Sequence, residues 1–227
     1  MNRSVFVVLP VYNEGRVVAS AIAPLLDRGY TAVAVDDGST DDTWPIIRSL
    51  PIHSLRHPVN LGQGAALQTG MTYALEHGAE YIVHFDADGQ HRVEDVDVLL
   101  EPLRKKEADV VLGSRFLRDE DRRAVPPVRR MLLKGGVIFN GLLTRVWLTD
   151  AHNGFRAMTR EAAATIGLRE NRFAHASEIL IQFRRNRLRV VERPTAIIYT
   201  DRSQAKGQSS LNAIKIVVDM ILRRIFR

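Results

Sequence analysis

Two aspartates, Asp86 and Asp88, directly follow an apolar run at 81–85, and Gly89 and Gln90 come after them. Side chains at i and i+2 of an extended chain point the same way, so Asp86, Asp88 and Gln90 can present oxygen ligands on one side. Mg²⁺ and Mn²⁺ prefer such oxygens, and Mg²⁺ commonly shares its shell with substrate phosphates. The segment therefore predicts a cation site that holds a diphosphate. The competing interpretation is a plain turn, because acidic residues followed by glycine often form turns.

The elements around this segment alternate between strands and helices. Short apolar segments predict strands at 5–9, 33–35, 53–55, 81–85 and 109–112. Helical patterns are expected at 17–26, 63–76 and 93–106. Ser39 or Thr40 is expected to cap a further helix after the second strand. Repeated strand–helix–strand units predict a Rossmann-like, mostly parallel α/β sheet with helices on both faces.

Polar clusters follow the predicted strands. They occupy 12–14, 36–38, 86–90 and 113–115. Ligands of such sheets bind beyond the carboxyl ends of the strands. We therefore expect the four clusters to meet at one edge of the sheet.

The composition is that of a folded protein. The 227 residues are 45% hydrophobic and 26% charged, and the absence of cysteine excludes disulfides and thiolate metal sites. The first residues predict a strand rather than a signal peptide, and no segment approaches the ~18 apolar residues of a membrane span. These features favour a cytoplasmic protein.

Positive charge gathers in the later part of the chain. The formal net charge is +6, and basic residues are frequent between 115 and 134 and again at the end. Basic surfaces attract nucleic acid, phosphorylated ligands or anionic lipid. No nucleic-acid-binding signature is present, so we expect no nucleic-acid partner and favour phosphorylated ligands or lipid.

Four segments together carry a resemblance to a known family. They lie at 10–14, 35–41, 60–66 and 85–90. In this order they resemble family 2 glycosyltransferases with the GT-A fold, most closely the dolichol-phosphate mannosyltransferase and polyprenyl-phosphate glycosyltransferase branch. The resemblance covers nearly the whole chain. It implies an enzyme that uses a nucleotide sugar, a GDP- or UDP-hexose.

The resemblance also implies roles for the metal-binding segment. Asp86 and Asp88 match the family's Asp-x-Asp motif, and Gln90 matches an additional ligand of this branch. The expected metal ligands are therefore Asp86, Asp88 and Gln90, with Mg²⁺ or Mn²⁺ as the cofactor. A bound cation would stabilise the charge that builds on the leaving diphosphate, which makes Asp88 a catalytic candidate.

The nucleotide pocket follows from the same resemblance. Asp37 is implied as the reader of the nucleobase, with Pro10, Tyr12 and Glu14 shaping the base and ribose pocket. Gly64 can permit close backbone approach to the donor. The alternatives are helix capping for Asp37, a packed aromatic for Tyr12 and a plain turn for Gly64.

The acceptor is predicted from a missing motif. Inverting transferases that act on a hydroxyl need a carboxylate base. Family members often display Glu-Asp for that role, and processive members add Gln-x-x-Arg-Trp, but neither motif occurs here. A phosphate monoester needs no base, because its second pKa is about 6 and it is mostly a dianion near neutrality. The missing motif therefore favours a phosphate acceptor.

A phosphate acceptor needs cationic partners, and the fork of arginine suits phosphate oxygens. The candidates are Arg115, Arg130, Lys134 and Arg202. By resemblance, Arg115 and Arg130 lie near the lipid phosphate and Arg202 lies in a loop that closes over the donor, so Arg115 and Arg202 join Asp88 as catalytic candidates. The plainer interpretation is that these are solvated surface residues.

The second half of the chain is less regular. We expect helices at 131–148 and 176–187, a polar loop at 150–156 and a strand at 190–199 that Pro194 interrupts. Asp150 and the Gly-Phe-Arg run at 154–156 resemble a family segment, and Glu178 matches an acidic helix position. These residues either shape the sugar pocket or brace the loops.

The last segment, 213–227, combines an apolar stripe with basic flanks, as does a helix that lies in an anionic membrane interface. We assign 1–210 to a GT-A catalytic domain and 211–227 to an amphipathic helix. This helix contacts the membrane, a small membrane partner protein or the domain itself. The expected location is the cytoplasmic face of the membrane.

The resulting prediction is a metal-dependent, inverting transferase that moves a hexose from a nucleotide sugar to polyprenyl phosphate. One alternative is a transferase that extends a hydroxyl acceptor of a cell-surface glycan, with Asp150 or Glu178 as its base. The other is a nucleotide-sugar-binding protein without turnover.

Overall fold

The computed structural model of the chain describes residues 4–117, 141, 147–150, 153–170 and 175–196. The chain divides into a unit at Met1–Ile197 and a unit at Ile198–Arg227, and the second unit lies outside the described residues. Outside them as well are Arg130, Lys134, Arg202, the predicted helix at 213–227 and nearly all of the one at 131–148.

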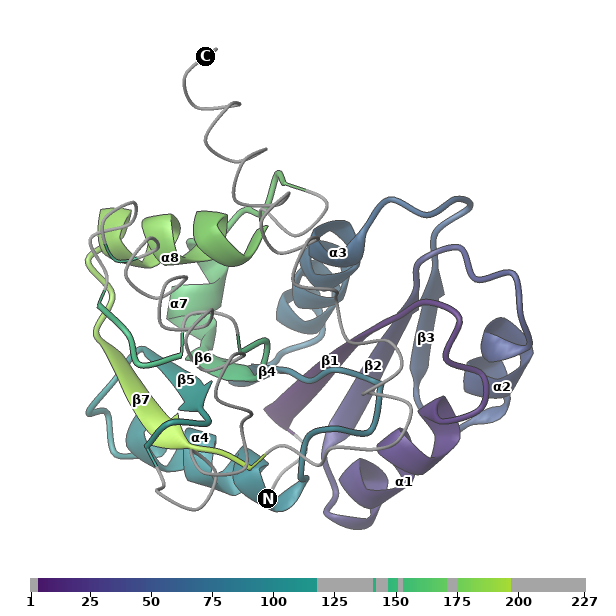
Figure 1. Cartoon of the computed structure of the whole chain (residues 1–227), viewed down its shortest axis with the longest axis horizontal. Coiled ribbons are helices and arrows are strands. Elements are labelled where there is room, and N and C mark those ends of the chain that lie inside the picture. Colours follow the sequence, from purple (N-terminus) through teal and green to yellow (C-terminus); the bar gives the residue numbers. More distant parts are fainter. Residues whose placement is uncertain (1–3, 118–140, 142–146, 151–152, 171–174, 197–227) are drawn as a thin grey trace, which may run out of the picture. The chain divides into compact units, whose positions relative to one another are not determined.

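A seven-stranded sheet forms the centre of the first unit, with the strand order β3-β2-β1-β4-β6-β5-β7 (Figure 1). The strands are β1 (Val5–Val11), β2 (Thr31–Asp36), β3 (His53–Arg56), β4 (Tyr81–His84), β5 (Val110–Ser114), β6 (Arg156–Thr159) and β7 (Val190–Pro194). β6 runs antiparallel to its neighbours β4 and β5, and the other pairs are parallel. The expected mostly parallel sheet is confirmed.

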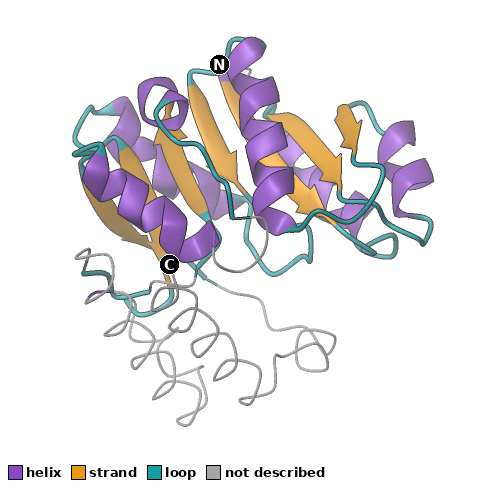
Figure 2. Cartoon of the chain, turned by 90° about the horizontal axis from the view of Figure 1, so that it is seen from above, coloured by secondary structure: helices purple, strands orange, loops and turns teal. Residues whose placement is uncertain are grey.

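Helices cover both faces of this sheet, as Figures 1 and 2 show. One face carries α1 (Val18–Asp27), α2 (Thr43–Ser49) and α4 (Glu94–Arg104). The other carries α3 (Gln63–Glu76), α7 (Arg160–Ala164) and α8 (His175–Arg185). This three-layer arrangement confirms the predicted fold class.

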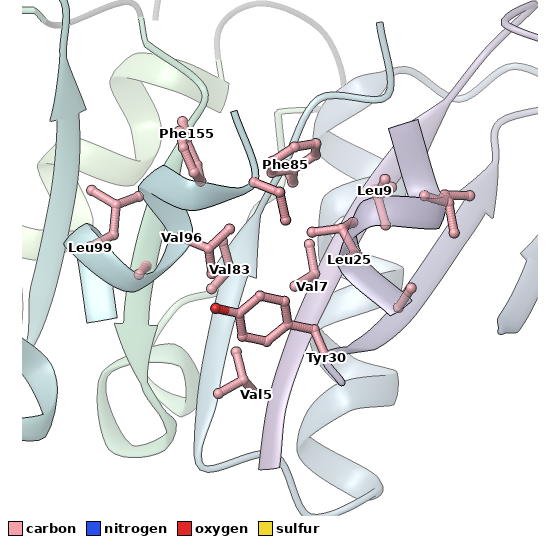
Figure 3. Packing of buried hydrophobic residues seen from close by; sticks show 14 of the residues in the cluster. Val5, Val7, Leu9, Leu25, Tyr30, Val83, Phe85, Val96, Leu99 and Phe155 are labelled. Atoms are coloured by element: carbon pink, nitrogen blue, oxygen red, sulfur yellow. The ribbon is translucent and has the colours of Figure 1, made fainter. Parts of the chain in front are cut away.

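The alternation of side chains along β1 produces a hydrophobic core on each face. Val7 and its alternate neighbours join the core with α1 and α4, whereas Phe6 and Val8 join the core with α3 and α8. In the first core, Phe85 and Phe155 meet edge to face with ring centroids 5.4 Å apart (Figure 3). Aromatic pairs of this kind contribute about 0.5–1.5 kcal/mol beyond their burial. The pair fixes the chain directly before Asp86.

Two details of local structure differ from the sequence-based expectations. The described residues of the loop expected at 150–156 are irregular up to Phe155, but Arg156 opens β6, a strand that was not predicted and whose register pairs Arg156 with His84 and with Leu112 of its two neighbours. Ser39 or Thr40 was expected to cap the helix after β2, but this helix begins at Thr43. The Asp41 carboxylate accepts the backbone N–H of Thr43 at 3.0 Å.

The last described strand ends where an interruption was expected. β7 ends at Pro194, and proline donates no hydrogen bond to a neighbouring strand, whereas 197–199 of the predicted strand lie outside the described residues. None of the helices in the described part of the chain has the length and apolar character needed to cross a membrane.

Candidate active site

The predicted polar clusters lie at the carboxyl edge of the sheet. β4 ends at His84, and the next residue, Phe85, still donates its backbone N–H to the Val8 carbonyl of β1 at 3.0 Å. Asp37 follows β2 and donates its N–H to the Val11 carbonyl at 2.8 Å. β5 runs in the same direction as β4, because both are antiparallel to β6. The clusters that follow β1, β2, β4 and β5 therefore share one edge, as predicted.

Asp86 is held at both carboxylate oxygens. Gln63, the first residue of α3, donates Nε2 to Oδ1 at 3.0 Å, and Nε2 of His91 lies 3.2 Å from Oδ2. Gly154 lies against the same carboxylate, since a Cβ atom added there would be 2.8 Å from Oδ2. Burial acts to raise the pKa of Asp86, but the hydrogen bond from His91 and the nearby positive charges outweigh it and lower the pKa. Asp86 is thus ionised and fixed in place.

Asp88 is held by its own turn. Gln90 donates its backbone N–H to Oδ1 at 3.0 Å and its side-chain amide to Oδ2 at 2.7 Å. Gly89 permits this turn with a φ of 76°. Burial, followed by the negative charge of Asp86, raises the pKa of Asp88. Carboxylates that repel each other in this way are stabilised when a divalent cation binds them.

The chemistry of these donors fits Mg²⁺ or Mn²⁺. Asp86 and Asp88 offer carboxylate oxygens, and Gln90 directs its amide nitrogen to Asp88, which leaves its amide oxygen for a cation. In the part of the chain that the structure describes, no group of three His, Asp or Glu side chains is placed to hold a metal. A partial protein shell is typical of Mg²⁺, which takes its remaining ligands from water and substrate phosphates.

Asp37 organises the loop that leads into α3. Its Oδ1 accepts from His57 Nδ1 at 2.7 Å and from the Leu61 N–H at 2.9 Å, and its Oδ2 accepts from the Gly62 N–H at 2.7 Å. The proposed helix cap after β2 is therefore not its role. Three of roughly four acceptor positions of the carboxylate are used. Base reading by Asp37 stays a prediction, and it would use the remaining position.

Three further residues of the predicted nucleotide pocket lie on or after β1. Tyr12 is 45% exposed, so the alternative of a packed aromatic is wrong. The negative charge of Glu14 contributes to the raised pKa of Asp88. Pro10 is half-buried within β1. Their contacts with a base or ribose stay predictions.

Gly64 has a packing role that the sequence did not reveal. A Cβ atom at this position would lie 2.2 Å from the Glu170 carbonyl oxygen and 2.9 Å from the Cβ of His175. The missing side chain therefore lets the first turn of α3 pack against the start of α8. Gly62 is the residue with the special backbone, because its φ of 106° is rarely adopted by other residues.

Arg115 and Asp150 form a buried bidentate ion pair. Arg115 donates Nε to Oδ2 at 2.6 Å and Nη2 to Oδ1 at 2.7 Å, and the two residues are 7% and 2% exposed. Glu192 accepts the backbone N–H of Asp150 at 3.1 Å and fixes this segment to β7. The plainer interpretation of Arg115 as a solvated surface residue is wrong. In its predicted role at the acceptor phosphate, Arg115 would have to contact the phosphate while its guanidinium also binds Asp150.

Glu178 braces a loop, one of the two interpretations that its sequence position allowed. Its carboxylate accepts the backbone N–H groups of Arg169 and Glu170 at 2.9–3.0 Å. These bonds fix the segment before α8. They also occupy the carboxylate that was one candidate base.

Three residues near the site were not predicted from the sequence as parts of it. Gln63 and His91 hold Asp86, and His57 holds Asp37. Gln63 and His91 do lie within or beside conspicuous motifs, which was the available signal. Their partners stand in other elements or turns, so only the folded chain shows what they contact.

Gly154 gives a direct test of how strictly Asp86 must be placed. We expect Gly154→Ala to lower the rate of sugar transfer by roughly 10-fold to 100-fold, because the added methyl group would push on the carboxylate and small displacements of reacting groups are costly. Initial rates and thermal unfolding should be measured together. Gly167→Ala is the matched control, since a Cβ at 167 meets no atom within 4 Å. Equal rates in both variants would contradict the prediction.

The fold and the carboxylate pair beyond β4 together define a GT-A-like glycosyltransferase. Residues 6–167 match the family described as glycosyl transferase family 2, and the chain belongs to this family. The resemblance inferred from the four sequence segments is thereby confirmed.

Relatives and solved structures agree with this assignment. A UDP-N-acetylglucosamine–dolichyl-phosphate N-acetylglucosaminyltransferase of Methanococcus voltae is 29% identical, over 97% of this chain and 96% of its own. An undecaprenyl-phosphate mannosyltransferase of Micrococcus luteus is 30% identical, over 89% of this chain and 86% of its own. The fold is shared with Mycobacterium tuberculosis glucosyl-3-phosphoglycerate synthase in complex with Mn²⁺ and UDP-glucose, with a TM-score of 0.64, 21% identity and coverage of 97% and 79%.

Proposed function

We propose that this glycosyltransferase transfers a hexose from a nucleotide-diphosphate sugar to polyprenyl phosphate, with inversion at the anomeric carbon and with Mg²⁺ or Mn²⁺ as cofactor. The names of the two relatives support a polyprenyl-phosphate acceptor. We further propose that the protein meets this lipid at the cytoplasmic face of the membrane, through 211–227 or a small membrane partner.

One structural observation favours a phosphate acceptor over a hydroxyl acceptor. The two carboxylates considered as bases, Asp150 and Glu178, are both committed within the protein. Asp150 is neutralised by Arg115 inside the protein, and Glu178 accepts backbone N–H groups. A base must reach the proton that it removes. To do so, either side chain would have to give up the hydrogen bonds that it makes within the protein.

The proposed reaction needs no proton transfer. An oxygen of the dianionic acceptor phosphate forms a bond to the anomeric carbon while the bond from that carbon to the diphosphate breaks. The electron pair of the broken bond remains on the nucleoside diphosphate. Asp86, Asp88 and Gln90 would hold the cation, which, when bound, stabilises that charge as a Lewis acid. Gln63 and His91 would keep Asp86 in position throughout.

A donor screen tests the proposal. The purified protein is incubated with polyprenyl phosphate, Mn²⁺ or Mg²⁺, and each of several radiolabelled donors, including GDP-mannose, UDP-glucose and UDP-N-acetylglucosamine. We expect one donor to give a labelled lipid that mild acid hydrolyses. A labelled oligosaccharide instead would support the transferase that extends a glycan hydroxyl. Donor binding without transfer to any acceptor would support a non-catalytic binding protein.

A further inference from the structure

Arg156 is a cation buried inside the sheet. The residue opens β6 and is 4% exposed. Its Nε donates to the Gly154 carbonyl at 3.2 Å, and within the described part of the chain no carboxylate lies at ion-pair distance from its guanidinium. Arginine is almost never fully buried unless its charge is paired. The fold must therefore compensate this charge from farther away.

The nearest titratable neighbour along the sheet cannot supply that compensation. His84 pairs with Arg156 in the register of β4 and β6. Its ring is buried, and neither ring nitrogen has a hydrogen-bond partner among the described residues. Burial, followed by the positive charge of Arg156, lowers the pKa of His84 well below its usual value. A histidine ring is either neutral or positive, so His84 cannot balance the charge of Arg156.

Asp86 is the carboxylate that the contacts of Gly154 connect to Arg156. Burial lowers the pKa of Arg156 to about 10, and the charge of Asp86 opposes that effect. The two residues are linked through Gly154, which accepts from Arg156 and lies directly against the Asp86 carboxylate. The charge of Arg156 in turn helps to lower the pKa of Asp86. Asp88, by contrast, accepts hydrogen bonds from Gln90, and these contacts do not involve Gly154.

We propose that Arg156 is the internal countercharge of Asp86, a positioning residue that balances this metal ligand across Gly154 while no cation is bound. The importance of this for catalysis rests on the proposed cation site. The charge pair itself does not depend on that site, because both of its charges belong to side chains of the protein. In this arrangement one of the two carboxylates is balanced before a cation binds.

A double-mutant cycle tests the countercharge. Unfolding in urea is measured in excess chelator for the wild type, Arg156→Met, Asp86→Asn and the double variant. We expect the two substitutions to be non-additive, with a coupling of at least about 5-fold in the unfolding equilibrium constant, because a neutral amide at position 86 no longer needs the positive charge of Arg156. The cycle measures the interaction between the two side chains, whether each single substitution raises or lowers the stability.

Matched variants separate this charge effect from a purely structural one. The same cycle with Asp88→Asn in place of Asp86→Asn should be additive, and Arg156→Lys should keep most of the coupling because it keeps the charge. Additivity at Asp86, or equal coupling at Asp86 and Asp88, would overturn the proposal. If Arg156→Met does not fold, Arg156→Gln carries the same cycle.

The outcome is independent of the donor screen. Coupling between Arg156 and Asp86 in a protein that transfers no sugar would leave the countercharge intact and reject the proposed function. Transfer to polyprenyl phosphate together with an additive cycle would support the proposed function and reject the countercharge. A weaker affinity for the nucleotide sugar in Arg156→Lys, with an additive cycle, would assign Arg156 to donor binding instead.

Discussion

Asp88→Asn is expected to lower the rate of sugar transfer by about 100-fold to 1,000-fold, the range typical for loss of a group that stabilises transition-state charge. The substitution keeps the shape of the side chain and removes one of the two carboxylates that would hold the cation. Burial and the charge of Asp86 already raise the pKa of Asp88, so this carboxylate gains the most when a cation binds. Initial rates at saturating Mn²⁺ and donor measure the effect.

Two controls accompany this measurement. Asp97→Asn removes a half-exposed carboxylate of α4 that pairs with Arg28 and Arg104, and it should leave the rate unchanged. Chelation of divalent cations should abolish transfer by the wild type, and added Mn²⁺ should restore it. Full activity of Asp88→Asn, or of the wild type in chelator, would refute the metal-dependent mechanism.

Asp150→Asn is expected to lower the free energy of unfolding by about 3–5 kcal/mol, because it removes the carboxylate that forms a bidentate pair with the buried Arg115. Both side chains are at most 9% exposed, and their two short hydrogen bonds form a bidentate pair. Urea unfolding monitored by circular dichroism measures the loss. A stability equal to that of the wild type would contradict the assigned role of this pair.

An exposed pair of the same geometry provides the control. Asp109 and Arg189 are also bidentate, with a shortest distance of 2.7 Å, but the Arg189 side chain is 57% exposed. Asp109→Asn should therefore cost much less, since solvent screens surface pairs. The stability measurement is also needed to interpret the activity of Arg115 variants. Their loss of activity counts as evidence for a phosphate-binding role only where the protein remains folded.

The parts of the fold that follow from local patterns could be predicted from the sequence. The apolar runs before Asp37 and Asp86 each ended a strand within one or two residues of the expected position, because short buried strands and their turns are encoded nearby. The helix at 63–76 was predicted with its observed bounds, since Gly62 marks its start. The meeting of the polar clusters then followed from the parallel topology.

The contacts within the site could not be predicted in this way. Arg115 and Asp150 are 35 positions apart, and Gln63 and Asp86 are 23 positions apart, so no local pattern joins them. β6 has only four residues and begins with a charged one, which gives it no strand signal of its own. Its burial comes from β4 and β5 on its two sides. Asp37 looked available for a base because its loop partners are not apparent in the sequence.

The reversed strand has a consequence for how this protein can be divided. Because β6 runs against its neighbours, it delivers its beginning, rather than its end, to the edge where Asp86 lies. Gly154, just before it, thereby lies against the carboxylate of Asp86, which comes from the first half of the chain. A fragment that stopped after β5 would retain both aspartates and lose the packing of Gly154 against Asp86. Any transplantable module of this enzyme must therefore extend at least through β6.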